Sequence, residues 1–392
     1  MKVLVVGSGG REHALVWALA RAGDGVELHA APGNPGIATL AQCHPARAED
    51  PAAVGPLASE LAVDLVVVGP EAPLVAGLAD ALRRRGIAVF GPGAAAARIE
   101  GSKAFAKEVM DAAGVPTART LAVARPPCVV KADGLAAGKG VWVCPDQASL
   151  DAALRAAQAL GQPFHVEEVL EGRELSVFAI AAGEEAVVLP AARDYKRIGD
   201  GDTGPNTGGM GSFTPVADAP PVDEILETVH LPVLRELARL GTPFTGCLYA
   251  GLMLTERGPQ VIEFNCRFGD PETQAILPCL EGNLLDALAA AAAGDLAGVE
   301  LAASDLAAVN VVIASRDYPE RGDSGTPIEL EKSDALVFHA GTALQDGRLV
   351  TNGGRVLNVV GTGETVDAAR AAAYESVARI HFDGMRYRRD IA

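Results

Sequence analysis

Short apolar segments alternate with alanine- and leucine-rich segments through the first hundred residues of the chain. The apolar segments cover 2–6, 26–30, 64–68 and 87–90, and each has the length of a single strand. Strands separated by helix-length segments form parallel sheets, because a parallel connection needs a crossover that a helix supplies. We therefore expect residues 1–100 to form a doubly wound parallel sheet covered by helices, with ligands at the carboxyl ends of its strands.

The pattern changes after residue 100, where longer helices and paired strands follow one another. A chain of 392 residues is too long for one ordinary core, so two to four packed units are expected. Helices are predicted over 103–113, 149–160, 222–240, 284–293 and 365–380. Strands are predicted within 129–143, on both sides of a loop, and over 166–169, 174–180, 248–254, 260–264, 307–314, 335–340 and 356–360.

The composition excludes some partners. A net charge of −17 and a pI near 4.9 argue against nucleic acid, because few cationic groups are available to displace phosphate counterions. The six cysteines form no CxxC pair, which is typical of small core residues in a reducing cytoplasm. No segment approaches the roughly 20 apolar residues that span a bilayer. We therefore expect a cytoplasmic protein without a membrane partner.

The run 261–274 contains the most specific chemical signal. Side chains alternate along a strand, so Glu263, Asn265 and Arg267 are expected on one face, followed by Asp270 and Glu272 in a turn. Oxygen donors suit Mg²⁺ bound to substrate phosphates, and a guanidinium suits a phosphoryl group that gains charge. The alternative is an edge strand whose polar face meets water. Five polar residues so close together favour the metal–phosphate site.

Gly9-Gly10-Arg11-Glu12-His13 follows the first predicted strand and opens a helix. Glycines let the backbone approach a ligand, and a helix N-terminus beside Arg11 attracts an anion. The motif is not a dinucleotide fingerprint, because Glu12 stands where the third glycine is needed. A monophosphate with a neighbouring sugar is therefore more plausible than NAD. The alternative, a plain tight turn, explains the glycines but not the polar residues that follow.

A second glycine-containing segment, 129–141, predicts a strand, a loop of small residues and another strand. It is not a Walker A loop, because the glycine spacing differs and no Ser or Thr follows Lys139. Gly138 and Gly140 still allow the loop to fold over phosphates. Lys131 lies among valines, where it would be costly without an anionic partner. An ordinary hairpin with a surface Lys139 remains the alternative.

Three further segments are less specific. Glu71 follows the strand at 64–68. Its carboxylate could accept hydrogen bonds from ribose hydroxyls, or it could stabilise the dipole of the helix that it begins. Taken alone, the motif favours the role in the helix. The acidic segment 165–174 could present backbone groups to adenine, but a solvated turn would look the same. The basic cluster 193–197 precedes the glycine-rich segment 202–211, and such a long loop favours a binding role.

Together these motifs resemble the glycinamide ribonucleotide synthetase (phosphoribosylamine–glycine ligase) family of ATP-grasp enzymes. The resemblance covers nearly the whole chain, and Arg267-Phe268-Gly269-Asp270-Pro271-Glu272 is its most specific part. The motifs that carry it, in chain order, are 9–13, 69–74, 101–105, 131–140, 204–211, 267–274, 338–342 and 351–357.

The resemblance implies a parallel-sheet domain at 1–100, an ATP-grasp domain at 101–300 with a small α+β lid near 117–185, and a mixed α/β C-terminal domain at 301–392. It implies a carboxylate–amine ligase of purine biosynthesis that joins glycine to 5-phosphoribosylamine through glycyl phosphate. ATP would be the co-substrate, with Mg²⁺ or Mn²⁺. A monomer or weak homodimer is expected. The reaction needs positioning and charge neutralisation rather than a protein nucleophile.

The resemblance also implies roles for individual residues. Arg267 and Lys139 would be catalytic, and Glu263 and Asn265 would hold the metal ion. The residues implied for ATP are Lys103, Lys131, Gly138, Lys139 and Gly140 at the phosphates, Glu167, Glu168, Val169 and Leu170 at adenine, and Glu174 at ribose. Those implied for phosphoribosylamine or glycine are Gly10, Arg11, Glu12, Glu71, Asp194, Lys196 and Asp270.

The chain departs from the family pattern in its presumed lid, where the connections 120–129 and 159–166 are short. Because short connections lose less entropy on ordering, we expect a lid that is ordered without nucleotide. Tyr195 and Arg193 stand where His and Gln are frequent, so contacts near Lys196 are expected to differ. Rival hypotheses are another ATP-grasp ligase, a biotin-dependent carboxylase and a non-catalytic nucleotide sensor.

Overall fold

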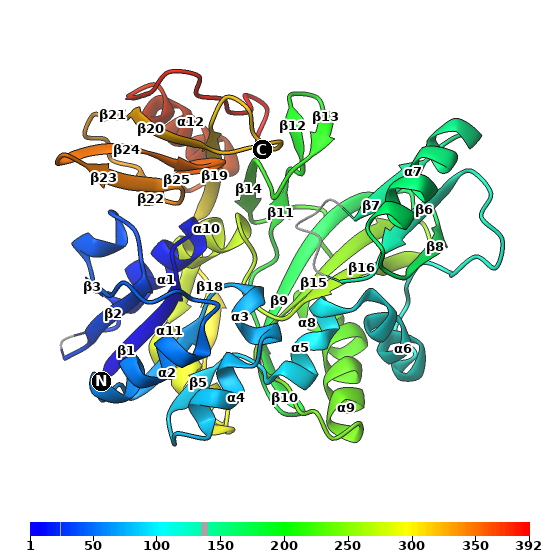
Figure 1. The fold of residues 1–392 in the computed structure, drawn as a ribbon, viewed down its shortest axis with the longest axis horizontal. Coiled ribbons are helices and arrows are strands. Elements are labelled where there is room, and N and C mark those ends of the chain that lie inside the picture. Colours follow the sequence, from blue (N-terminus) through cyan, green and yellow to red (C-terminus); the bar gives the residue numbers. More distant parts are fainter. Residues whose placement is uncertain (24, 135–139) are drawn as a thin grey trace.

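The computed structural model of the chain describes residues 1–23, 25–134 and 140–392 (Figure 1). The first hundred residues form the parallel sheet that the alternation predicts, with strand order β3-β2-β1-β4-β5. Its strands are β1 (Lys2–Gly7), β2 (Glu27–Pro32), β3 (Gln42–Cys43), β4 (Leu65–Val68) and β5 (Ala88–Phe90). Its helices are α1 (Gly10–Leu19), α2 (Pro51–Glu60), α3 (Glu71–Val75), α4 (Leu78–Arg83) and α5 (Ala94–Gly101).

A four-stranded antiparallel sheet follows, in the order β10-β9-β15-β16. This sheet is buried on both faces. Side chains alternate along β9, so Leu175 and Val177 belong to one hydrophobic cluster, and Phe178 and Ile180 belong to another. The strands are β9 (Arg173–Ala182), β10 (Glu185–Val188), β15 (Thr245–Thr255) and β16 (Gly258–Asn265), and the helices around them are α6 (Lys103–Ala113), α8 (Val222–Ile225), α9 (Leu231–Arg239), α10 (Glu272–Ile276) and α11 (Leu284–Ala293).

The predicted helix 222–240 contains one irregular turn. Residues Leu226–His230 form a π-helical turn between α8 and α9, and Pro232 begins the helix that follows. A proline lacks the N–H that a regular helix would use, so the hydrogen-bond pattern changes where it enters. His230 in this turn is fully buried.

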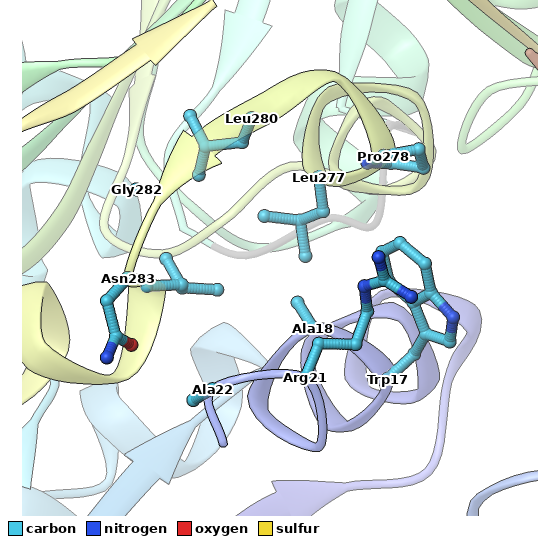
Figure 2. Close-up of a pocket in the computed structure, with 10 residues that line it drawn as sticks. Trp17, Ala18, Arg21, Ala22, Leu277, Pro278, Leu280, Gly282 and Asn283 are labelled. Carbon is cyan, nitrogen blue, oxygen red and sulfur yellow. The ribbon is translucent and has the colours of Figure 1, made fainter. Parts of the chain in front are cut away.

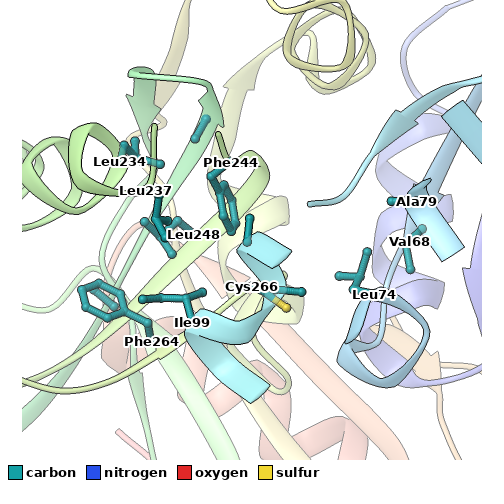
Figure 3. Close-up of a cluster of buried hydrophobic side chains, with 14 of the residues drawn as sticks. Val68, Leu74, Ala79, Ile99, Leu234, Leu237, Phe244, Leu248, Phe264 and Cys266 are labelled. Carbon is teal, nitrogen blue, oxygen red and sulfur yellow. The ribbon is translucent and has the colours of Figure 1, made fainter. Parts of the chain in front are cut away.

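The parallel sheet and the antiparallel sheet share one hydrophobic core. Figure 3 shows Ile99 of α5 beside Phe264 of β16, and Leu74 of α3 belongs to the same cluster of buried side chains. Each of these three side chains is at most 2% exposed. Because the two sheets bury apolar surface against each other, the end of β16 is held in a fixed relation to α5.

A small unit projects from the body of the molecule on the right of Figure 1, and we call it the lid unit. It consists of β6 (Cys128–Ala132), β7 (Val141–Cys144), α7 (Gln147–Ala159) and β8 (Phe164–Glu168), with sheet order β7-β6-β8. Its separate core includes Cys128, Val130 and Leu150. The lid expected near 117–185 includes β9, but β9 pairs with β15 in the antiparallel sheet.

The C-terminal part is a sheet of order β11-β14-β19-β25-β22, packed against α12 (Val366–Val377). The strands of this sheet are β11 (Arg193–Asp194), β14 (Gly211–Thr214), β19 (Ala307–Ala314), β22 (Leu336–His339) and β25 (Arg355–Gly363). Smaller ladders were not predicted from the sequence, and they use β12 (Arg197–Gly199), β13 (Thr203–Asn206), β17 (Leu280–Gly282), β18 (Leu301–Ala303), β20 (Asp323–Pro327), β21 (Glu329–Leu330), β23 (Thr342–Gln345), β24 (Arg348–Gly353) and β26 (Ile380–His381).

The glycine-rich segment, predicted as a loop, is partly a hairpin. Strands β12 and β13 pair across a turn in which Asp202 has a positive φ. Tight turns of this kind favour Gly, Asn and Asp, which explains why the segment reads as a loop. Within the described part of the chain, no helix is long and apolar enough to span a bilayer.

Candidate active site

Glu263 and Asn265 lie on β16, opposite Gly251 and Tyr249 of β15. Both side chains are half-buried, and neither forms a hydrogen bond or ion pair with another described residue. The described residues contain no group of three or more His, Cys, Asp or Glu side chains that could hold a metal ion. Two oxygen donors fit a Mg²⁺ ion that takes its other ligands from substrate phosphates and water.

Arg267 follows β16 and is held by two carboxylates from the first hundred residues. Its Nε donates to Glu71 Oε2 at 3.1 Å, and its Nη2 donates to Glu100 Oε1 at 2.8 Å. Its Nη1 donates to the backbone oxygen of Phe268 at 3.3 Å. The guanidinium therefore has a fixed orientation just after the strand that carries the two candidate metal ligands.

The two carboxylates around Arg267 are not equivalent. Burial raises the pKa of Glu71, but Arg267 and Arg11 outweigh that effect and bring the pKa to about 2. Burial raises the pKa of Glu100 above its usual range, although Arg267 opposes the shift. Glu71 is thus an anion at neutral pH. Sequence reasoning assigned no role to Glu100, although it stands immediately before the Gly101-Ser102-Lys103 motif.

The Gly9-Gly10-Arg11-Glu12 turn lies on the same side of the molecule. Glu12 accepts hydrogen bonds from the Gly9 backbone N–H and from Arg11 Nε, both at 2.6 Å, and Arg11 Nη1 donates to the Phe268 backbone oxygen at 3.0 Å. A Cβ at Gly69 would approach Glu12 to 2.2 Å. Glu12 therefore caps this turn from inside, and Arg11 connects it to the residue after Arg267.

Asp270 connects the same loop to the C-terminal sheet. Its carboxylate accepts from Gln274 Nε2 at 2.8 Å and pairs with Arg355 at 3.1 Å. Arg355 also donates to the backbone oxygens of Gly208 and Asp270. Burial raises the pKa of Asp270, but Arg355 and Arg11 lower it below its usual value. Arg355 belongs to a motif that supports the family resemblance, but its contacts were not predicted.

Lys131 on β6 is buried and pairs with an anionic side chain, Glu167, as its position among valines predicts. Its Nζ lies 2.6 Å from Glu167 Oε2 and donates to the backbone oxygen of Ile262 at 3.0 Å. Glu167 also pairs with Lys107 at 3.5 Å. Burial raises the pKa of Glu167, but His165 and Lys131 bring it to about 2. Lys131 thus links the lid unit to the strand that carries Glu263.

Lys103 and Gly140, two other predicted phosphate ligands, contact residues at the end of β6 and just after it. Lys103 begins α6 and donates to the backbone oxygen of Gly134 at 3.1 Å. Burial lowers the pKa of Lys103, while Glu263 raises it and Lys131 lowers it, so these three groups lie within electrostatic reach of one another. Gly138 and Lys139 lie outside the described residues, whereas Gly140 pairs through its backbone oxygen with the N–H of Ala132.

The predicted adenine and ribose ligands occupy the connection from β8 to β9. Glu168 pairs with Arg119 and Arg257 at 2.8 Å and 3.0 Å, so its carboxylate faces those arginines. Val169 and Leu170 are half-buried. Glu174, near the start of β9, pairs with Lys196. Because the carboxylates of Glu168 and Glu174 already have cationic partners, the backbone N–H and C=O groups of residues 168–170 are the groups available to bind an adenine.

Lys196 and Asp194 lie near Glu174, with their charged atoms 3.9 Å apart. Burial raises the pKa of Asp194 to about 7, although Lys196 opposes the shift, and Glu272, Glu174 and Glu263 add to it. The charged groups that affect Asp194 are therefore Glu174 of β9, Glu263 of β16, Glu272 of α10 and Lys196, which lies between β11 and β12. Sequence reasoning did not find the buried hydroxyl chain beside it, in which Ser176 Oγ lies 3.1 Å from both Tyr249 and Glu272.

A cavity of about 310 Å³ lies elsewhere, between the C-terminal half of α1 and residues 277–284 (Figure 2). Trp17 of α1 and Arg21, two residues after that helix, form one wall, with the guanidinium 5.0 Å from the ring centroid. None of the predicted site residues lines this cavity. Among the described site residues, Lys131 contacts Ile262 of β16, and Arg11 contacts Phe268 in the loop that follows β16.

Comparison with family models identifies the chain. The N, ATP-grasp (A) and C domains of phosphoribosylglycinamide synthetase match residues 1–100, 101–273 and 308–392. The chain belongs to the phosphoribosylglycinamide synthetase family. Two relatives named phosphoribosylamine–glycine ligase, from Streptomyces coelicolor and Corynebacterium ammoniagenes, are 52% and 50% identical to it. The alignments cover 100% of this chain and 99% and 97% of the relatives.

Solved structures agree with the family assignment. The phosphoribosylamine–glycine ligase of Thermotoga maritima has a TM-score of 0.87 and 38% identity, with 100% of both chains covered. The biotin carboxylase domain of the Hydrogenobacter thermophilus 2-oxoglutarate carboxylase, solved with MgADP, has a TM-score of 0.73 at 17% identity, covering 98% of this chain and 91% of that one. The second likeness shows the shared fold. The predicted three-part α/β architecture with an ATP-grasp domain is confirmed.

Proposed function

We propose that this member of the phosphoribosylglycinamide synthetase family joins glycine to 5-phosphoribosylamine with ATP, as one step of purine biosynthesis. A glycine carboxylate oxygen attacks the γ-phosphorus and releases ADP. The amine then attacks the carbonyl carbon of glycyl phosphate, phosphate leaves, and the amine nitrogen loses a proton. The products are glycinamide ribonucleotide, ADP and phosphate.

The arrangement of Arg267 carries this proposal. Arg267 follows two unpaired oxygen donors on β16 and faces two carboxylates from the first hundred residues. A phosphoryl group that gains charge during transfer is stabilised by a guanidinium with a fixed orientation. The full-length match to phosphoribosylamine–glycine ligases selects glycine and phosphoribosylamine among the carboxylates and amines that such a site accepts.

We assign the predicted site residues to the metal ion, to the nucleotide and to the acceptor. Glu263 and Asn265 hold a divalent cation, Mg²⁺ or Mn²⁺, which when bound neutralises charge on the ATP phosphates. On the nucleotide side, Lys103, Lys131, Gly138, Lys139 and Gly140 bind phosphates, Glu167, Glu168, Val169 and Leu170 surround adenine, and Glu174 binds ribose. On the acceptor side, Gly10, Arg11, Glu12, Glu71, Asp194, Lys196 and Asp270 face phosphoribosylamine or glycine.

The domain boundaries and the setting of the enzyme are part of the same proposal. Residues 1–100 form the domain that binds the acceptor, and residues 101–300 form the ATP-grasp domain, with a lid inside 117–185. Residues 301–392 form the C-terminal domain. The described cysteines are all free thiols, which fits a reducing cytoplasm. We expect a monomer or weak homodimer that binds small molecules and no nucleic acid or membrane.

One assay tests the proposal directly. ADP release is measured with ATP, Mg²⁺, glycine and freshly generated phosphoribosylamine, and again with each component omitted in turn. Full turnover that requires all of them supports the ligase. Rapid ADP release that is independent of glycine contradicts it, as does nucleotide binding without any turnover, which the sensor hypothesis expects.

A second assay tests the metal ligands. Glu263→Gln keeps the size of the side chain but removes its charge, so we expect a loss of several kcal/mol of transition-state stabilisation. The measurement is kcat over a series of Mg²⁺ and Mn²⁺ concentrations, with circular dichroism to confirm folding. Normal turnover of the folded variant at saturating metal would show that Glu263 is not a ligand.

A further inference from the structure

We infer that Glu100 is a positioning residue for phosphoryl transfer, which fixes the Arg267 guanidinium and the end of β16 in one arrangement. The inference rests on the proposed function, because it gives Arg267 a role in the reaction. Glu100 is the penultimate residue of α5 and lies 167 positions from Arg267 in the chain.

The carboxylate of Glu100 contacts two consecutive residues with its two oxygens. Oε1 accepts from Arg267 Nη2 at 2.8 Å, and Oε2 accepts from the backbone N–H of Cys266 at 2.8 Å. Cys266 stands between Asn265, a candidate metal ligand, and Arg267. One side chain therefore fixes both the guanidinium and the backbone that separates it from the metal site.

Glu100 can do this because its own helix is fixed. Ile99, the preceding residue, is 1% exposed and packs with Phe264 and Cys266 in the shared hydrophobic core (Figure 3). The Glu100 side chain is only 7% exposed. A carboxylate held by a packed helix cannot follow the guanidinium if it moves, so it restrains Arg267 rather than merely accompanying it.

The second carboxylate on Arg267 is more exposed and forms the longer hydrogen bond. Glu71 is 32% exposed at its side chain, lies on the five-residue helix α3, and contacts Arg267 through a single 3.1 Å hydrogen bond. An incoming anion can replace Glu71 more easily than Glu100. The guanidinium has five N–H donors in a rigid plane, so an arginine held at one edge by Glu100 keeps other donors for a phosphoryl oxygen.

Glu100→Gln tests the inference, because it keeps the shape of the side chain and an acceptor for the Cys266 N–H. We expect kcat to fall on the order of 100-fold, the effect of a small misplacement of a catalytic group. The KM for ATP should change less than about twofold, since the phosphate-binding lysines are untouched. Glu236→Gln is the matched control, because Glu236 pairs with Arg239 on α9 and is expected to have no effect on kcat.

A double-mutant cycle separates positioning from a general structural role. If Glu100 acts through Arg267, then Glu100→Gln should lower the remaining single-turnover rate of Arg267→Ala by less than about threefold. A loss that multiplies fully in that background would overturn the inference, as would a normal kcat in folded Glu100→Gln. Failure of the proposed function is distinguishable, because the unaltered protein would then show no glycine-dependent ADP release.

Glu100→Asp covers the case in which Glu100→Gln does not fold. It keeps the charge but withdraws the carboxylate by one methylene, so we expect a folded protein with kcat reduced on the order of 10-fold and the same dependence on Arg267. Normal kcat in folded Glu100→Asp would overturn the inference. If neither variant folds, Glu100 serves folding, and the positioning role is wrong.

Discussion

Lys131 and Arg267 are both buried cations at the proposed site, but the structure holds them in different ways. Lys131 belongs to the lid unit, whose separate core is small, and its Nζ reaches across to the Ile262 backbone oxygen. Arg267 follows a strand of the main body and is held by carboxylates on two helices of the first hundred residues. One cation is thus placed by a small unit with a separate core, and the other by the core that the two large sheets share.

This difference suits the two steps of the proposed reaction. ATP must enter and ADP must leave, so a phosphate-binding lysine on a small unit can accompany that exchange. Glycyl phosphate must stay out of water until the amine attacks, so the arginine beside it should not move. We therefore expect damage on the Arg267 side to reduce kcat, and damage on the Lys131 side to weaken ATP binding.

The largest expected effect comes from Arg267→Ala. Removing an arginine that stabilises a transferring phosphoryl group costs on the order of 1,000-fold or more in kcat. Steady-state kinetics with saturating ATP and glycine should show this loss with little change in the KM for ATP. Arg239→Ala, at an exposed arginine of α9, is the control and should retain full activity. A rise in the KM for ATP without loss of kcat would show that Arg267 serves ATP binding rather than catalysis.

As the pH falls, we expect the main body of the molecule to lose folding stability before the lid unit does. Burial lowers the pKa of His230 and of His339 to about 4, and burial and His339 lower the pKa of His13 to about 3. Unfolded histidine takes up a proton near pH 6.5, so folding stability falls as the pH drops from 6.5 towards 4. Each group contributes up to about 3 kcal/mol.

Urea denaturation at a series of pH values measures this dependence. His230→Leu should flatten it, because the apolar side chain binds no proton, while His381→Gln at an exposed position should not. A second decline is expected between pH 4.5 and 2, where Glu71 and Glu167 lose the stabilisation that their lowered pKa values provide. Stability that stays constant between pH 6.5 and 4 would contradict the assignment to buried neutral histidines.

A smaller effect is expected from Glu167→Gln in the lid unit. Hydrogen bonds to charged groups contribute about 1.5–3 kcal/mol, so loss of the Lys131 partner should raise the KM for ATP on the order of 10-fold. The kcat at saturating ATP should remain close to that of the unaltered protein. Asp151→Asn on the exposed side of α7 is the control, because its partner is Gln147 in the same helix. A pure kcat effect would place Glu167 with the catalytic group instead.

The smallest effect concerns the order of the lid unit without nucleotide. Its connections are short, and its three strands cover a separate core, so the amides of β6 and β8 should resist hydrogen exchange before ATP is added. Adding a non-hydrolysable ATP analogue should then increase protection only slightly. Amides of β15 serve as the internal reference. A large increase that depends on the analogue would show that nucleotide orders the lid.

Sequence patterns predicted those parts of the fold whose information is local. The strands at 2–6 and 64–68 and the helix at 103–113 follow from apolar runs and a glycine stop, and the structure confirms them. The hairpin of β12 and β13 was read as a loop, because its residues are those of turns and its pairing is not visible in a hydrophobic pattern.

The site shows the same limit. Glu263 and Asn265 are two residues apart on β16 and Arg267 follows two residues later, so the expected alternation of a strand is enough to group them. Glu100 is a carboxylate at a helix end, and only the fold brings it within 2.8 Å of Arg267. Nothing in the sequence distinguishes Ser176 and Tyr249 from other strand residues, and only the fold brings their hydroxyls together beside Glu272. The roles of the predicted site residues, Glu263, Asn265 and Arg267 included, stay predictions.

The lid unit contains one of the two tryptophans of the chain, Trp142 on β7. The other, Trp17, lies on α1 beside the guanidinium of Arg21. Replacing Trp17 with Phe would leave a single indole, located on the unit expected to shift. Its emission would then follow nucleotide entry and exit in real time, with no added dye.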